Sequence, residues 1–130
     1  MSCNIALGNG VSNETVLKCV KHIVDAFHFQ WKQEADCAKR LNALFMRQCI
    51  SDESFPFREA RQATAREDFA LGTDLFILHK TMWVPCNIKG SRRLLDEHKK
   101  KYPRVLGFVY RPNFSNEQII SELNVVFSER

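Results

Sequence analysis

The sequence has few of the residues that interrupt folded segments, with five glycines and four prolines, and it has no low-complexity tract. This scarcity argues against long disordered regions. No apolar run approaches the length of a membrane span. The N-terminal residues MSCNIALGNG lack the basic start and the apolar core of a signal peptide. The sequence therefore predicts an intracellular protein, cytoplasmic or nuclear, without a membrane partner.

Cysteines are present, but they do not form a pattern that indicates bridges or a metal. The five cysteines have wide and irregular gaps, and no secretory signal accompanies them, which indicates reduced thiols. A structural zinc site usually needs paired short spacings, whereas the short spacing of Cys19 and His22 stands alone. The sequence predicts neither a cofactor nor a metal site.

Complete catalytic motifs are also missing. The residues MWVPCNIK (82–89) resemble the active-site turn of thioredoxin, in which a proline precedes the second cysteine of a Cys-x-x-Cys motif. Trp83 stands in the position of the first cysteine, so dithiol exchange is excluded at this turn. No glycine-rich phosphate loop is present. The sequence favours a non-enzymatic protein, and a thiol-dependent enzyme that uses Cys86 is a further alternative.

Apolar side chains at helical spacing predict three N-terminal helices over residues 12–31, 33–50 and 56–70. Ser12 or Asn13 is the expected N-cap of the first helix, and Gly72 is the expected stop of the third.

Short apolar runs in the C-terminal half predict strands over residues 74–80 and 104–110. A further strand is expected over residues 82–89, at the edge of the sheet because Pro85 cannot donate a backbone hydrogen bond. Helices are expected over residues 91–101 and 115–130, the last with a capping box formed by Ser115 and Gln118.

The predicted fold class is α+β, or a small α/β fold. Three N-terminal helices precede a β-α-β-α unit, whose two- or three-stranded sheet is covered by helices. The strands over 74–80 and 104–110 are expected to be parallel neighbours joined by a crossover helix. An antiparallel arrangement with residues 82–89 between them is the alternative. Residues 1–11 are expected to form a flexible arm or loop, and residues 12–130 a single globular domain.

Positive charge is concentrated in the segment KGSRRLLDEHKKKYPR (89–104). It holds seven Lys and Arg residues against two acidic residues, whereas the whole chain has a net charge of +4. Two arginines fall in the first turn of the expected helix, where the helix dipole disfavours cations. A glycine, a capping hydroxyl and free backbone N–H groups beside them suit a phosphate or carboxylate. The predicted anion- and nucleic-acid-binding residues are Lys89, Gly90, Ser91, Arg92, Arg93, Lys99, Lys100, Lys101 and Arg104.

A second interpretation of the same segment is a helix face that neutralises its own charge. Its acidic residues, Asp96 and Glu97, each have a cation four residues before and four residues after. Such spacing allows ion pairs along the helix. Trp83 and Tyr102 flank the segment, and they are possible stacking partners for bases.

These features favour a non-enzymatic module that binds RNA, a nucleic-acid single strand or another polyanion through the basic helix. The alternative is a protein–protein adaptor, a homo-oligomer or a subunit of a larger complex, with the amphipathic helices as the interface.

Overall fold

The structure is a computed structural model, and it describes residues 12–130, except for the side chains of residues 26–28. The arm expected over residues 1–11 lies outside this described part. The chain divides into two compact units, Met1–Gln33 and Glu34–Arg130. No helix in the described part combines the length and the apolar character that a membrane crossing requires.

A single helix, α1 (Asn13–Ser51), replaces the first two predicted helices. The predicted break near residue 32 was wrong, because the chain has no glycine or proline between residues 11 and 55 to interrupt the backbone hydrogen bonds. The Ser12 hydroxyl accepts a hydrogen bond from the backbone N–H of Thr15 at 3.1 Å, as expected of an N-cap. Pro56 follows the end of α1 and disfavours its continuation.

The predicted third helix was also wrong, because strand β1 (Phe57–Gln62) and the short helix α2 (Ala65–Leu71) occupy its place. β1 pairs antiparallel with β2 (Leu75–His79). Pairing with a neighbouring strand supplies hydrogen bonds that the sequence of β1 does not reveal, so tertiary contacts override its weak helical pattern.

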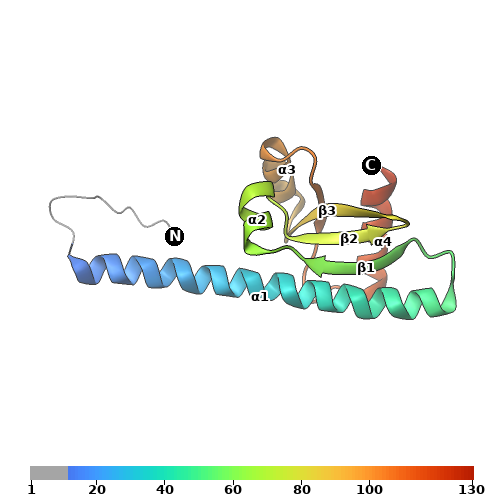
Figure 1. The fold of residues 1–130 in the computed structure, drawn as a ribbon, viewed down its shortest axis with the longest axis horizontal. Helices are drawn as coiled ribbons and strands as arrows, with labels where there is room; N and C mark the ends of the chain where they lie inside the picture. Colours follow the sequence, from blue (N-terminus) through green and yellow to red (C-terminus); the bar gives the residue numbers. More distant parts are fainter. Residues whose placement is uncertain (1–11) are drawn as a thin grey trace. The chain divides into compact units, whose positions relative to one another are not determined.

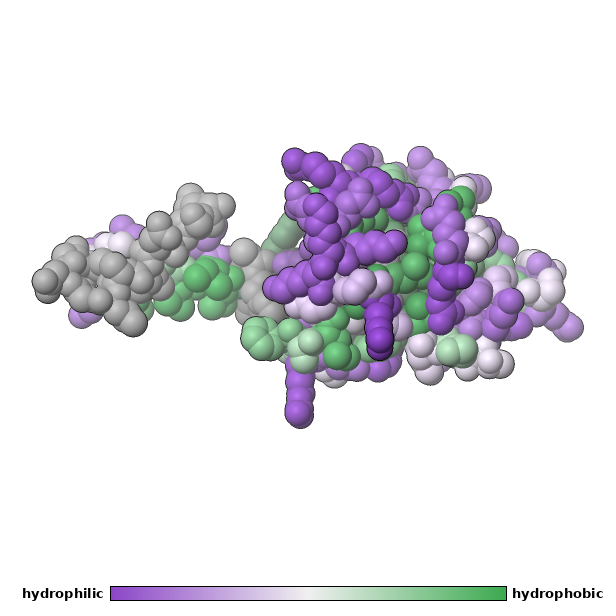
Figure 2. Space-filling view, turned by 90° about the horizontal axis from the view of Figure 1, so that it is seen from above, coloured by the Kyte–Doolittle hydropathy of each residue, from purple (hydrophilic) through white to green (hydrophobic). Residues whose placement is uncertain are grey.

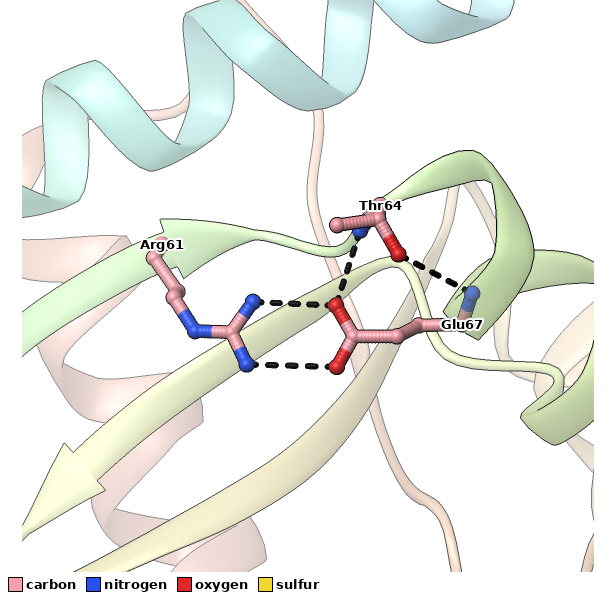
Figure 3. A network of polar contacts seen from close by, with 3 residues as sticks. All are labelled: Arg61, Thr64 and Glu67. Atoms are coloured by element: carbon pink, nitrogen blue, oxygen red, sulfur yellow. Dashed lines mark hydrogen bonds and ion pairs between the residues drawn. The ribbon is translucent and has the colours of Figure 1, made fainter.

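Helix α2 is short, but both of its ends are capped. Its N-cap, Thr64, forms a capping box with Glu67, and the same carboxylate receives two hydrogen bonds from Arg61, at 3.0 and 3.2 Å (Figure 3). The helix ends at Gly72 in the left-handed conformation, with φ of 62°. The predicted stop at Gly72 is therefore confirmed.

The sheet has four strands, rather than two or three, in the order β1–β2–β3–β4. β3 (Met82–Lys89) pairs antiparallel with β2 and parallel with β4 (Leu106–Val109). The predicted neighbours, β2 and β4, are therefore separated by β3, as the alternative arrangement expected. The parallel crossover unit is β3–α3–β4, with α3 over Arg92–Lys101.

The prediction that residues 82–89 form an edge strand was wrong, since β3 has a neighbour on each side. Pro85 is tolerated because β4 pairs with β3 from Cys86 to Lys89. Pro85 therefore lies outside this pairing, at a position where a backbone N–H is not needed for a hydrogen bond to β4.

One face of the sheet forms the core of the second unit. The C-terminal part of α1 and helix α4 (Asn116–Ser128) cover this face (Figure 1). The capping box of Ser115 and Gln118 starts α4 as predicted. The largest fully buried apolar side chains are Phe45, Phe57, Phe108, Leu41, Leu75, Ile77 and Leu123.

Helix α3 lies on the opposite face of the sheet. A Cβ atom added to Gly107 of β4 would meet Leu95 of α3 at 2.6 Å, so this glycine permits the close approach of the helix. At the outer edge of the sheet, the Asn42 side chain of α1 donates to Ala60 O at 2.6 Å and accepts from Ala60 N at 2.7 Å. These bonds satisfy backbone groups of the edge strand β1.

Candidate functional site

The start of the basic segment is an open loop at the end of β3. Ser91 is the N-cap of α3, and its hydroxyl accepts a hydrogen bond from the Leu94 N–H. A Cβ atom at Gly90 would meet nothing within 4 Å. The Arg111 Nε atom donates to Gly90 O at 2.7 Å. Arg111 was not among the predicted anion-binding residues, because only the parallel pairing of β3 and β4 brings residue 111 beside residue 90.

Arg92 has an acidic partner on another element. Its Nη2 atom donates to Glu122 Oε1 of α4 at 2.6 Å. The same oxygen accepts the Val109 N–H of β4 at 3.0 Å. Glu122 therefore connects α3, β4 and α4, and it compensates the cation that the helix dipole disfavours.

The predicted ion pairs along α3 do not form. Across the described residues, neither Asp96 nor Glu97 lies within ion-pair distance of a cation four residues away. The first turn of α3 holds no acidic residue, whereas its last turn holds a run of three lysines after His98. Figure 2 shows hydrophilic side chains gathered over the face of the second unit that carries α3. The charge of the helix face is thus left without acidic partners on the same helix.

Two aromatic side chains lie near the C-terminal end of this helix. A groove of about 420 Å³ is lined by Phe76, Tyr102, Lys101 and Arg104 among others. The Lys101 ammonium lies 5.5 Å from the ring centroid of Tyr102, and the Arg61 guanidinium lies 4.3 Å from that of Phe76. These distances allow cation–π attraction. The groove therefore combines apolar rings with cations.

Trp83 lies on the same sheet face as Phe76. Phe76 pairs with Pro85 and Leu78 pairs with Trp83, and residues two apart on a strand share a face. Trp83 is 42% exposed. Phe76 could not be identified from the sequence, because the apolar run of β2 does not show which of its residues face the core.

Cys86 does not have the surroundings of a reactive thiol. It is completely buried, and burial raises the pKa of its thiol above the ordinary value. A raised pKa disfavours the thiolate, which is the nucleophilic form. The turn that resembles thioredoxin is strand β3 in this structure.

A second polar cluster, absent from the sequence analysis, lies within the unit Glu34–Arg130. The carboxylates of Glu34 in α1, Asp68 in α2 and Asp74 before β2 lie within 4.8 Å of one another. Asp74 Oδ2 accepts hydrogen bonds from Asn87 Nδ2 at 2.7 Å and from Ile88 N at 2.9 Å. No short spacing in the sequence marks these residues, since separate elements supply them.

The three carboxyl groups are costly to ionise together. Burial, then the charges of Asp74 and Asp68, raise the pKa of Glu34 to about 8. Burial is also the main cause of the raised pKa values of Asp68 and Asp74. The Lys89 ammonium opposes all three shifts. Lys89, a predicted phosphate ligand, thus also acts on the acidic cluster.

Comparisons with known proteins add no relative: no family model, no curated protein and no solved structure matches this chain.

Proposed function

We propose that this chain is a non-enzymatic module that binds a polyanion, with RNA or another nucleic-acid single strand as its partner. The observation that supports this function best is the basic face of α3, whose cations have no acidic partner on the same helix within the described part of the chain. Uncompensated cations that are close together favour phosphate binding by release of counterions. The fold itself carries no information on the partner.

The groove at the C-terminal end of α3 supports a single strand over a duplex. Tyr102 and Phe76 offer ring faces, and Lys101 and Arg104 add cations beside them. Bases of a single strand are free to stack on such rings, and stacking contributes about 1–3 kcal/mol per base. Trp83 extends the same sheet face with a further exposed ring.

The predicted contact residues are not equivalent. Arg92 is engaged by Glu122, and Lys89 acts on the acidic cluster. Arg93 and the lysines of the last helical turn are exposed. We therefore assign the main phosphate contacts to Arg93, Lys99, Lys100, Lys101 and Arg104.

The test is fluorescence anisotropy with a labelled oligouridylate, measured over a series of salt concentrations. In the double variant Lys100→Glu/Lys101→Glu, we expect weaker binding. The slope of the logarithm of the binding constant against the logarithm of the salt concentration is expected to fall in magnitude by about 1.4, because each lost phosphate contact on a single strand contributes about 0.7. The matched control, Lys21→Glu/Lys32→Glu, makes the same charge change outside the basic segment. Undetectable binding of the unaltered chain at low salt would contradict the proposal.

A comparison of the two arginines tests the assignment further. Arg93→Ala is expected to weaken oligouridylate binding more than Arg92→Ala, since Arg92 is already paired with Glu122. Equal losses would show that both arginines contact the polyanion.

A second candidate function is self-association through the N-terminal part of α1. Val20 is 45% exposed and Ile23 is 54% exposed, and Figure 2 shows green hydrophobic residues in this part of the helix. The same helix buries Leu41 and Phe45 in the core, so one apolar stripe is covered at its C-terminal end and exposed at its N-terminal end. A helix from a second copy would cover such a stripe.

Sedimentation velocity tests this second function. The unaltered chain is expected to show a mass that rises with concentration, and Val20→Glu/Ile23→Glu is expected to be monomeric. Ile50→Glu, which changes an exposed isoleucine at the other end of α1, is the control. A monomeric unaltered chain at high concentration would exclude self-association.

A further inference from the structure

Two buried polar atoms in the described part of the chain have no hydrogen-bond partner, Glu34 Oε2 and Asn87 Oδ1. Both side chains are 2% exposed. Both belong to the acidic cluster, because Glu34 is one of its members and Asn87 Nδ2 lies 2.7 Å from Asp74 Oδ2. Buried polar atoms without a partner are rare. Because the Glu34 side chain lies within hydrogen-bond reach of Asp74, the missing partner of Glu34 Oε2 is either an ion or a proton shared between the two carboxyl groups.

We propose that Glu34, Asp68, Asp74 and Asn87 bind a divalent cation, and that Ca²⁺ fits this site best. Carboxylate and amide oxygens are the ligands that hard cations prefer. The proposal is independent of the polyanion-binding function, which rests on other residues.

The number of protein ligands favours Ca²⁺ over Mg²⁺. Three carboxylates whose oxygens lie within 4.8 Å of one another, and the amide of Asn87 beside Asp74, can contact one ion. Ca²⁺ takes six to eight oxygen ligands in flexible geometry, whereas Mg²⁺ keeps several waters and is usually bound by one or two carboxylates.

Asn87 can supply a neutral ligand beside the carboxylates. Rotating its amide by half a turn exchanges Nδ2 and Oδ1, which places the unpaired oxygen toward Asp74. The two orientations differ in their polar partners and not in shape. With a cation at Asp74, the oxygen becomes the favoured atom at this position, and the 2.7 Å hydrogen bond from Asn87 Nδ2 to Asp74 Oδ2 is exchanged for a contact between Asn87 Oδ1 and the ion.

The surroundings of the acidic cluster give an ion access from the solvent, and they also place a competing positive charge near the carboxylates. Asp68 is half-buried, which gives an ion access from the solvent. Lys89 supplies a positive charge near the carboxylates, but it forms no ion pair with them among the described residues. A bound cation would replace this long-range compensation with direct contacts. The competing explanation is that Glu34 and Asp74 share a proton, which would satisfy Glu34 Oε2 without an ion.

The experiment uses the full chain, stripped with EDTA and then dialysed, in thermal unfolding and isothermal titration calorimetry with CaCl₂ or MgCl₂. We expect Ca²⁺ to raise Tm, to bind with a stoichiometry near one and to bind at least tenfold more tightly than Mg²⁺. Asp68→Asn is expected to weaken Ca²⁺ binding at least tenfold, because it removes a charged ligand. Asp96→Asn, which changes an exposed carboxylate on α3, is expected to leave binding unchanged.

A Tm of the unaltered chain that does not respond to 10 mM CaCl₂ would overturn the proposal, as would equal Ca²⁺ affinities of the Asp68→Asn and Asp96→Asn variants. Lys89→Ala is a second variant that does not remove a ligand, and we expect it to bind Ca²⁺ more tightly. Glu34→Gln separates the two explanations. If Glu34 and Asp74 share a proton, the Tm of the variant is expected to be unchanged or higher, and the unaltered chain is expected not to respond to Ca²⁺. If the cluster binds an ion, the variant is expected to lose the Ca²⁺ response that the unaltered chain shows.

Discussion

At the scale of single residues, Gly72 meets two requirements at once. Its φ of 62° lies in the left-handed region, which other residues adopt at a cost. An added Cβ would also meet the Tyr102 ring at 2.4 Å. The glycine thus ends α2 and lets Tyr102 pack beside it.

Replacing this glycine is expected to destabilise the fold. For Gly72→Ala, we expect a loss of at least about 1–3 kcal/mol in the free energy of unfolding, from backbone strain and from displacement of the Tyr102 ring. Gly90→Ala is the matched control, since a Cβ there meets open space, and its effect is expected to be within about 0.5 kcal/mol. Urea unfolding measures both. Equal effects of the two substitutions would show that the αL conformation at residue 72 carries no cost.

Glu67 gives the stability a pH dependence. The side chain of Arg61 and the backbone of Thr64 lower the pKa of Glu67 from 4.5 to about 2. Because the folded chain holds this carboxylate ionised more strongly than the unfolded chain, its stabilising contribution is present above pH 4.5 and is lost as the pH falls toward 2.

We expect Glu67→Gln to be less stable than the unaltered chain at pH 7, and the difference between the two to shrink between pH 4.5 and pH 2. Urea unfolding over this pH range measures it. Glu59→Gln, at an exposed position of β1, is the control. A stability difference for Glu67→Gln that is the same at pH 2 and pH 7 would rule out this ion pair as its source.

At the level of secondary-structure elements, α1 has one apolar stripe that is buried in one part of the helix and exposed in another. Leu41 is fully buried in the core of the second unit, whereas Ile23 in the first unit is 54% exposed. Both residues fit the same helical periodicity. Periodicity therefore reports which face of a helix is apolar and not which part of that face is covered.

Truncation of these two residues is expected to have unequal effects on stability. Leu41→Ala is expected to lower the free energy of unfolding by about 2–5 kcal/mol, because it leaves a cavity in the core. Ile23→Ala is expected to change it by less than about 0.5 kcal/mol in dilute solution. Chemical denaturation measures both values. A large loss for Ile23→Ala in a monomeric sample would show that the first unit is packed against other residues.

At the scale of the whole molecule, the two compact units differ in what holds them. The second unit has a four-stranded sheet with helices on both faces. The described helix of the first unit carries large exposed apolar residues. A helical segment with few tertiary contacts is marginal in water, so the two units are expected to open with different free energies.

Amide hydrogen exchange tests this difference. Amides of residues 14–24 are expected to exchange at least tenfold faster than those of residues 38–48 of the same helix. If a second copy covers the exposed stripe, protection of residues 14–24 is expected to rise with protein concentration. Equal protection along α1 in a dilute sample would contradict the expectation.

Local chemistry decided several features that the sequence predicted well. The caps at Ser91 and Ser115 and the stop at Gly72 were found because each depends on a side chain or a backbone preference next to the helix end. Strand β1 was not found, because its six residues become a strand only by pairing with β2. The acidic cluster was not found either, since Glu34, Asp68 and Asp74 are far apart in the chain.

Short-range preferences and composition are enough to indicate the α+β class, the starts of the two C-terminal helices and the concentration of positive charge in residues 89–104. Packing between distant segments sets the strand order, the pairing of Arg92 with Glu122 in place of ion pairs along α3, and the meeting of three carboxylates with Asn87. These features depend on contacts between residues distant in the chain, and such contacts arise only when the sheet and its covering helices pack together.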